Sequence, residues 1–382
     1  MRNTSAKSSL YLKYACLFSC LSQVHPLQAL EFKTGFYLPT SINYDSNLQM
    51  VERNEKSVVF YNTAPRISLV GADEVNTVNL DGSILFQRSS DDQISESRRD
   101  PTVGLGWTRD FTKGQFSLST NYNKTSTRVS ELRRTGVVFG DGSAINRSIN
   151  AGLSYLLTEK LNLNTGLGYQ EVNYSGPGAG LTDFSSKTAS AKLSYLYSQQ
   201  LSPFVQISIN KYENDTNTIN AVVGSDSSIS RNLLAGYTYQ ISPKTDYSIA
   251  AGVNSVSSAG SGWIGVASMR YAINEKSNVS GGIARTIVAS GLGGFQKSDS
   301  LNLNYTYDVN QSNRLGAEIS WNINRALNDT RFKQISGSYT HDISDRWGVR
   351  TYAQFRTLDG NNTSADGYQV GVSLNYINPN FF

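Results

Sequence analysis

The chain has 382 residues, of which 34 are basic and 30 acidic, giving a formal net charge of +4. This near balance argues against a nucleic-acid partner, and a mean hydropathy of −0.35 without a long apolar stretch excludes a helical membrane protein. The 22 tyrosines, 32 glycines and only 8 prolines are typical of a long β protein.

The first 29 residues have the pattern of a secretory signal peptide. Basic residues precede the first acid, Glu31, and the apolar run 14–21 leads to a cleavage pattern, HPLQA, that ends at Ala29. Eight apolar residues fall far short of the ~20 that a transmembrane helix needs, so we do not expect an anchor. We expect a signal peptide at 1–29 and a single β domain at 30–382.

Removal of this signal would change the chemistry available to the mature chain. Cys16, Cys20 and His25 would leave with it, so that His341 remains as the only histidine and the net charge falls to +1. Without thiols, disulfides and thiolate metal sites are excluded. We therefore expect no cofactor, no metal site and no nucleic-acid partner.

Short turn signals alternate with longer polar connections along the rest of the chain. Tight turns are expected near 71–74, 110–114, 157–160, 199–203, 241–244, 273–276, 309–313 and 343–346, and longer loops near 88–99, 126–144, 173–185 and 214–226. Eight hairpins supply sixteen strands, and a first strand near 40–48 and a last at 366–377 bring the count to eighteen. The predicted fold class is all-β: a transmembrane antiparallel up-and-down β-barrel of about 18 strands, with short periplasmic turns and longer extracellular loops.

Individual segments show which face is apolar. In the segment 161–170, Leu161, Leu163 and Leu167 share one face, while Asn162 and Asn164 share the other. A period of two indicates a β-strand with two different faces. In an outer-membrane barrel the apolar face contacts lipid and the polar face lines the lumen. A soluble β-helix or a large sandwich could alternate in the same way, but would not need aromatic residues beside its turns.

Aromatic residues do recur beside the expected tight turns. They are Phe111, Phe116, Tyr197, Phe204, Tyr239, Tyr247, Tyr271, Tyr307, Tyr339 and Trp347. Tyrosine and tryptophan rings prefer the membrane–water interface. We interpret these residues as the aromatic girdle at the periplasmic end, and place the protein in the bacterial outer membrane.

The last strand predicts a partner. Tyr368, Val370, Val372 and Leu374 alternate with polar residues, and the chain ends on Phe382. A terminal aromatic after an alternating strand resembles the signal that the barrel-assembly machinery reads in outer-membrane proteins. We expect that machinery to bind this strand.

Charged residues fall on both faces of the predicted strands. By parity, the lumen-lining set is Arg66, Asp81, Lys192, Arg270, Arg314, Glu318, Asn322, Arg350 and Arg356. Its mixed sign argues against a strongly ion-selective pore. Abundant asparagine, serine, glutamine and tyrosine suit uncharged, hydroxyl-rich ligands such as sugars, although any water-filled barrel needs a polar lining.

Basic residues recur on the lipid-facing register at the loop ends of the strands. They are Arg88, Lys124, Arg147, Lys187, Lys211, Arg231, Arg285, Lys297, Arg325, Arg331 and Lys333, against which we expect only two acids, Glu171 and Asp299. The phosphates of lipopolysaccharide in the outer leaflet could pair with such a band. Snorkelling of long side chains towards water is the simpler alternative, but it does not require the asymmetry. We expect outer-membrane lipid and lipopolysaccharide as partners.

No constellation of catalytic residues stands out. His341 lies beside a turn with Asp342 and Asp345 near, which is more typical of a solvated turn than of a catalytic triad. The glycine runs at 176–180 and 291–294 are not followed by a helix, so they are not phosphate-binding loops. We do not expect the protein to be an enzyme.

The mature chain resembles the β-barrel porin family that includes barrels encoded with exopolysaccharide biosynthesis genes. The resemblance rests on the Tyr-Asp-Ser-Asn element at 44–47 and on the glycine–aromatic hairpins at 103–125 and 153–176. It implies an outer-membrane conduit in polysaccharide export, with polysaccharide and export proteins as further partners, and it brings no catalytic residues. A general passive porin for small hydrophilic solutes is the alternative, followed by a barrel enzyme.

Overall fold

The computed structural model describes residues 31–135, 141–176, 181–214, 227–325, 329–360 and 364–381. The expected signal peptide lies outside this range, as does Phe382. Within the described ranges, no helix is long and apolar enough to cross a membrane.

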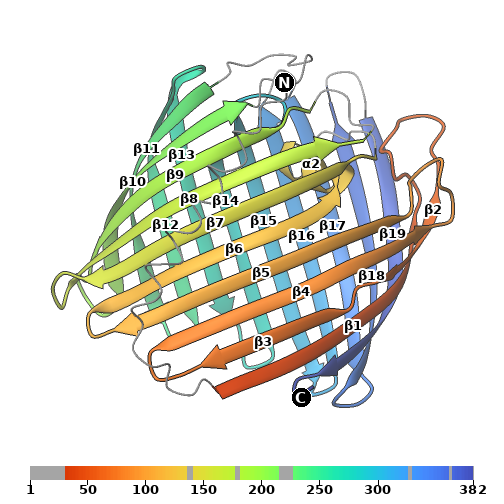
Figure 1. Ribbon diagram of the computed structural model, residues 1–382, viewed down its shortest axis with the longest axis horizontal. Coiled ribbons are helices and arrows are strands. Elements are labelled where there is room, and N and C mark those ends of the chain that lie inside the picture. Colours follow the sequence, from red (N-terminus) through yellow and green to blue (C-terminus); the bar gives the residue numbers. More distant parts are fainter. Residues whose placement is uncertain are drawn as a thin grey trace, which may run out of the picture.

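The described chain is almost entirely β-structure (Figure 1). The strands are β1 (Glu31–Asp45), β2 (Val58–Thr63), β3 (Arg66–Ala72), β4 (Asn76–Ser89), β5 (Arg98–Phe111), β6 (Gly114–Ser126), β7 (Ser143–Leu156), β8 (Leu161–Ser175), β9 (Phe184–Tyr195), β10 (Leu201–Asn214), β11 (Ser227–Ser242), β12 (Thr245–Val256), β13 (Gly260–Ala272), β14 (Ser277–Ala289), β15 (Phe295–Asn310), β16 (Asn313–Arg325), β17 (Asp329–Asp342), β18 (Trp347–Asp359) and β19 (Ser364–Asn378). One helix, α2 (Thr127–Thr135), lies between β6 and β7.

β2 and β3 are two halves of one strand. Both pair with β1 and with β4, and the register with each neighbour is the same before and after the break. The break falls at Ala64 and Pro65, where proline has no N–H to donate to the ladder. The nineteen segments therefore make an eighteen-stranded barrel, as predicted.

The sheet closes on itself through β1 and β19. Ten antiparallel pairs join them, from Phe36 opposite Asn378 to Asp45 opposite Gln369, and every other strand pairs with its sequence neighbours. All eight predicted tight turns join strands as expected. The first strand begins at Glu31 and not near residue 40, because the alternation of 41–45 continues backwards into less regular sequence.

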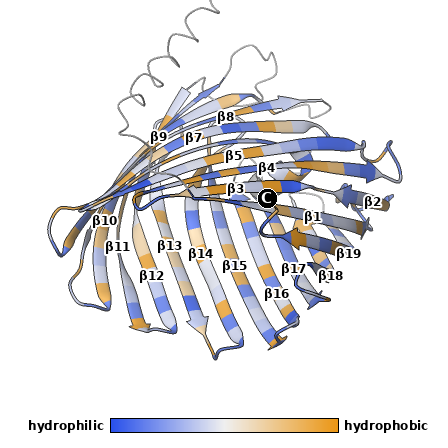
Figure 2. Cartoon of the chain, turned by 60° about the horizontal axis from the view of Figure 1, so that its bottom comes forward, coloured by the Kyte–Doolittle hydropathy of each residue, from blue (hydrophilic) through white to orange (hydrophobic). Residues whose placement is uncertain are grey.

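The outer face of the barrel is apolar. On β19, Tyr368, Val370, Val372 and Leu374 are exposed, with 53% of Val372 accessible, whereas Gly371 between them is buried. Figure 2 shows hydrophobic and hydrophilic residues alternating along the strands. A closed barrel with a continuous apolar exterior is stable only in lipid. The protein is thus a transmembrane barrel of the bacterial outer membrane.

The aromatic girdle is present, with one exception. Tyr271, Tyr339 and Trp347 are exposed on the outer register near the turns. The prediction for Phe204 was wrong, because this ring faces inward and is buried. Lys192 lies over it, with Nζ 3.9 Å from the ring centroid. Phe204 therefore packs in the lumen wall and does not contact lipid.

The long connection at 126–144 is not a simple loop, because it contains α2. The Ser126 hydroxyl accepts a hydrogen bond from the backbone N–H of Arg128 at 3.2 Å, in the manner of an N-cap. The backbone N–H of Thr127 donates to the carbonyl of Gly142, and the N–H of Gly142 donates to the Thr127 hydroxyl, both at 3.0 Å. These bonds fix the helix where the loop enters and leaves the barrel mouth.

Candidate functional site: a polar lumen with a packed mouth

The predicted lumen-lining residues all lie on the inward register. Arg350 pairs with Ser373, whereas its neighbour Val349 pairs with the exposed Leu374. Arg270 pairs with Asp246 and Ser280, and Glu318 pairs with Asn304 and Ser336. The other members of the set follow the same alternation.

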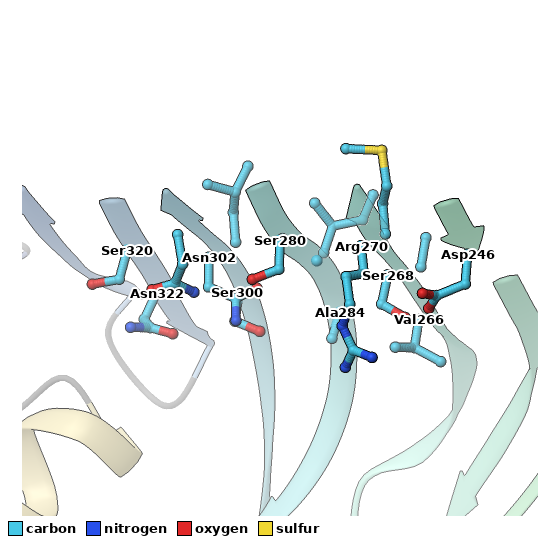
Figure 3. A pocket seen from close by; sticks show the side chains of 17 residues that line it. Asp246, Val266, Ser268, Arg270, Ser280, Ala284, Ser300, Asn302, Ser320 and Asn322 are labelled. Atoms are coloured by element: carbon cyan, nitrogen blue, oxygen red, sulfur yellow. The ribbon is translucent and has the colours of Figure 1, made fainter. Parts of the chain in front are cut away.

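A band of small polar side chains crosses the inner wall between β12 and β16. Adjacent strands place Ser268, Asn302 and Ser320 in one row, and Ser300 beside Asn322 in the next. These residues line a hollow of about 550 Å³. In the close view their hydroxyl and amide groups follow one another from strand to strand (Figure 3). We refer to this band as the serine–asparagine track.

A second hollow continues the track from β16 to β19. It measures about 600 Å³ and is lined by side chains that include Glu318, Asn322, Gln334, Arg350 and Gln354. Amides and hydroxyls again predominate, and the two charges have opposite sign. Each such group can donate or accept hydrogen bonds to a neutral solute.

Four other charged residues of the lumen form two local ion pairs. Arg66 lies 2.7 Å from Asp81, and Arg314 lies 2.6 Å from Asp308. Both pairs are largely exposed to the lumen, so they contribute little to stability. Paired charges present a smaller net field to a passing ion than free ones would.

At the loop end of the lumen, an ionic network is centred on Asp141. Its carboxylate accepts hydrogen bonds from the Ser95 hydroxyl at 2.7 Å and the Glu96 backbone N–H at 2.9 Å. Arg98 and Arg128 lie 3.7 and 3.4 Å from the same carboxylate. One acid thereby ties the β4–β5 loop to the β6–β7 connection.

Helix α2 continues this packing along the β6–β8 side of the mouth. Thr127, Arg128 and Glu131 are buried, and the Tyr174 hydroxyl on β8 donates to Glu131 Oε1 at 2.9 Å. Burial lowers the pKa of Arg128, while the carboxylates of Asp141 and Asp45 act in the opposite direction. In Figure 1 the helix lies at the loop end of the barrel.

The Tyr-Asp-Ser-Asn element at 44–47 belongs to this mouth. Arg356 Nη2 lies 2.7 Å from both carboxylate oxygens of Asp45, and both side chains are buried. The Asn47 amide donates to the carbonyls of Val51 and Asp366. Arg356 therefore faces inward, but it is buried in this ion pair and is not accessible to a passing solute.

An aromatic cluster packs next to α2, in contact with Tyr174. The rings of Phe184 and Tyr212 stack with centroids 5.1 Å apart, and Phe295 lies 5.9 Å from Tyr212. The Tyr212 hydroxyl donates to the carbonyl of Ser290 at 3.1 Å, which connects β10 to the loop after β14. This cluster was not predicted from the sequence, although the alternation of β9 and β10 places Phe184 and Tyr212 on the inward face.

The sequence offered His341 with Asp342 and Asp345 as a possible triad, and the structure shows the partners of this histidine. His341 Nδ1 lies 2.9 Å from the side-chain oxygen of Asn313, which also accepts from the Tyr339 hydroxyl. No group of three or more potential metal ligands occurs among the residues described. His341 thus takes part in a hydrogen-bonded turn.

The basic residues assigned to the lipid face lie on the outward register. They are Arg88, Lys124, Arg147, Lys187, Lys211, Arg231, Arg285, Lys297, Arg325, Arg331 and Lys333. All occur near the loop ends, where a lipid-facing charge costs only ~0–1 kcal/mol, against ~2–4 kcal/mol at mid-depth.

The expectation of only two acids in this band was wrong. Glu213, Asp329 and Asp359 share the outward register and pair with Lys187, Arg325 and Lys333 respectively. Arg147 pairs with Glu171, and Arg285 and Arg325 both pair with Asp299. The acids were missed because they stand at strand ends, where the alternation in the sequence fades. The band is a set of ion pairs with a positive excess.

No protein-family model and no curated protein matches this sequence. Among solved structures, the chain is similar to OpdQ of Pseudomonas aeruginosa, with 11% identity over 91% of this chain and 98% of that chain and a TM-score of 0.50. It is also similar to OccAB4 of Acinetobacter baumannii, at 9% identity, 93% and 100% coverage and a TM-score of 0.50. The siderophore receptor PirA of the same organism gives 8% identity, 93% and 81% coverage and a TM-score of 0.51. The chain shares the outer-membrane barrel fold of these proteins.

Proposed function

We propose that the barrel is an outer-membrane conduit for neutral, hydroxyl-rich molecules. The observation that carries the proposal is the serine–asparagine track, which continues from β12 to β19 and whose few charged side chains balance in sign. Closely spaced hydroxyls and amides can replace the hydrogen bonds that a sugar makes with water. A glycan would therefore be held weakly at each position and could move along the track. An eighteen-stranded barrel is wide enough for an aqueous lumen.

The more specific form of this proposal is polysaccharide export. A continuous track suits a chain of repeated units better than a single compact solute, because successive sugars can occupy successive rows. The packed mouth would then have to open during passage. Polysaccharide synthases and export proteins are the partners that this role requires.

A passive porin for small hydrophilic solutes is the second candidate. The observation in its favour is the mouth itself, where Asp141, Arg128 and Tyr174 hold α2 in place. A mouth that stays packed admits only small molecules. The two candidates differ in whether a polymer crosses the barrel.

A pair of tryptophan variants on one strand separates these roles. Arg350→Trp places a large ring in the lumen, whereas Thr351→Trp places it on the lipid face of the same strand. The export role predicts that a deletion strain lacks surface polysaccharide, that Thr351→Trp restores it and that Arg350→Trp does not. Both variants must reach the outer membrane as folded barrels, which heat-dependent migration on gels reports.

Purified protein in planar bilayers tests conduction itself. Stable channels of weak ion selectivity are expected, and Arg350→Trp should reduce their conductance while Thr351→Trp leaves it unchanged. Normal surface polysaccharide in the deletion strain, together with conducting channels, would reject export and leave the small-solute porin. Lack of conductance both in wild type and in Asp141→Asn, which removes the charge shared by Arg98 and Arg128 at the mouth, would reject both roles.

A further inference from the structure

A shallow apolar groove lies on the outer face of the barrel between β6 and β10. It has a volume of about 500 Å³ and is lined chiefly by Leu118, Ile149, Ala151, Leu167, Ala189 and Ile209. The register explains the hollow. Leu118, Ala151, Leu167, Ala189 and Ile209 form one row across five strands, so two alanines alternate with three large side chains.

The next two rows towards the loops change from apolar to charged. The first of these rows consists of Ile149, Tyr169, Lys187 and Lys211. Two of its side chains, Tyr169 and Lys187, line the end of the groove. Tyr122, Arg147, Glu171 and Glu213 belong to the second. Successive outward rows are two residues apart, or about 7 Å, so an apolar slot leads within two rows into a polar, cationic region.

The cations at the head of the groove keep hydrogen-bonding capacity. Glu213 is shared by two ammonium groups, with Lys187 Nζ at 2.6 Å and Lys211 Nζ at 2.5 Å. Each ammonium has three N–H donors, and one carboxylate cannot satisfy all six. Arg231, in the apolar row beside Ile209, adds another positive charge. The local charge is therefore positive even after the ion pairs are formed.

We propose that this surface is a binding site for one phosphorylated, multi-acyl glycolipid of the outer leaflet, namely lipopolysaccharide. An acyl chain lies in the slot over Ala151 and Ala189. A phosphate accepts hydrogen bonds from Lys187 and Lys211, and the sugar moiety stacks near Tyr169. The site combines a slot that fits an acyl chain with cations that complement a phosphate. The rest of the basic band offers the cations without such a slot.

Two variants test the two halves of the site separately. Lys187→Gln with Lys211→Gln removes the cations, and Ala151→Leu with Ala189→Leu fills the slot while keeping the outer face apolar. The matched control, Arg331→Gln with Lys333→Gln, removes two cations of the same outer band on β17, away from the groove. Native mass spectrometry and thermal unfolding in detergent, with added purified lipopolysaccharide, report binding and the stabilisation that binding confers.

Each double variant at the groove should weaken lipopolysaccharide binding by about tenfold or more, equivalent to at least about 1.4 kcal/mol, and the control should bind as wild type. Enzymatically dephosphorylated lipopolysaccharide should bind wild type weakly, and phosphatidylglycerol should not replace the intact lipid. Equal losses in the control would overturn the proposal in favour of a non-specific basic band. Undiminished binding in the filled-slot variant would also overturn it, as would a dimer at this face in lipid-free detergent.

Discussion

Arg356 on β18 and Asp45 on β1 form an ion pair across β19, in which Arg356 Nη2 lies 2.7 Å from each carboxylate oxygen of Asp45. The pair spans the closing seam of the barrel, and the Tyr352 hydroxyl donates to Asn43 across the same strand at 3.0 Å. Gly371 of β19 lies beneath, where an added Cβ would meet the Tyr352 ring. The seam is thus held by side chains as well as by the backbone ladder.

We expect Asp45→Ala to destabilise the barrel strongly. Only 1% of the Asp45 side chain is exposed, so the variant leaves the buried guanidinium of Arg356 without its counter-charge. Loss of one partner of a buried pair costs about 3–5 kcal/mol. The free energy of unfolding, measured by urea titration in detergent or lipid vesicles, checks this value.

Asp81→Ala is the matched control, because Asp81 pairs with Arg66 at the same distance while 41% and 54% of their side chains are exposed. Loss of this pair should cost less than about 1 kcal/mol. Similar losses in the two variants would mean that the seam pair is hydrated and contributes no more than a surface ion pair.

Asp141→Asn should loosen the mouth. The neutral amide keeps the shape but removes the charge that Arg98 and Arg128 share. The variant also weakens the charge-assisted hydrogen bonds that the carboxylate accepts from Ser95 and the Glu96 N–H. Because such bonds contribute about 1.5–3 kcal/mol each, the population of an open mouth should rise by about tenfold or more. Single-channel recordings should show larger and noisier conductance, whereas Glu318→Gln in the lumen wall should alter ion preference alone. If the conductance of Asp141→Asn equals that of wild type, the role assigned to α2 is contradicted.

The β3–β4 turn should give a local acid-sensitive contribution to stability. The Asn76 side chain, followed by the backbone N–H groups of Val75 and Asn76, holds the pKa of Asp73 below its ordinary value near 3.8. A carboxyl whose folded-state pKa is lowered stabilises the fold above the unfolded-state value and loses this contribution as the pH falls through the folded-state value.

Asp73→Asn should therefore be less stable than wild type at neutral pH and approach it below pH ~3.8. Thermal unfolding over a pH series checks this convergence, and the exposed turn variant Glu159→Gln should show no such trend. A constant difference between Asp73→Asn and wild type at all pH values would exclude titration of Asp73 as the cause.

Phe381→Ala tests the proposed recognition of the C-terminal strand by the barrel-assembly machinery. Phe381 stacks on Phe36 with centroids 5.1 Å apart, and its N–H donates to the carbonyl of Thr34. We expect a lower yield of folded barrel in cells with a smaller effect on refolding in detergent. Phe355→Ala, a lipid-facing aromatic in mid-strand, should not show this difference. Equal losses in cells and in detergent would indicate a purely structural role.

Alternation and turn signals together predicted most strands and their faces, with the start of β1 and the face of Phe204 as exceptions. The period of two fixes which side chains point outward, as for Val372 and Gly371, and the turn signals fix where each strand reverses. The strand count was predictable because each hairpin carries its own turn signal. These features are local, so they are readable without knowledge of the fold.

The mouth was not predictable, because it is built from contacts between distant residues. Asp45 and Arg356 are 311 positions apart, and no local pattern connects them. Helix α2 had a weak signal: Ser126 as a cap before Glu131 and Leu132, both good helix formers. The strongly β pattern on either side obscured it. The Tyr-Asp-Ser-Asn element was noticed in the sequence as a motif, but nothing there indicated that its Asp45 pairs with Arg356 across the closing seam.

The closing seam also constrains how the barrel can form. Tyr37 and Asn375, which bond across it, are 338 positions apart. Contacts of such long range form late, because a large loss of chain entropy precedes them. Until they form, β1 and β19 are both open edges with unpaired N–H and C=O groups, which invite pairing with other chains. The closed barrel has no free strand edge, but the partly folded chain exposes two and is prone to aggregation. The chain therefore needs a chaperone between export and insertion.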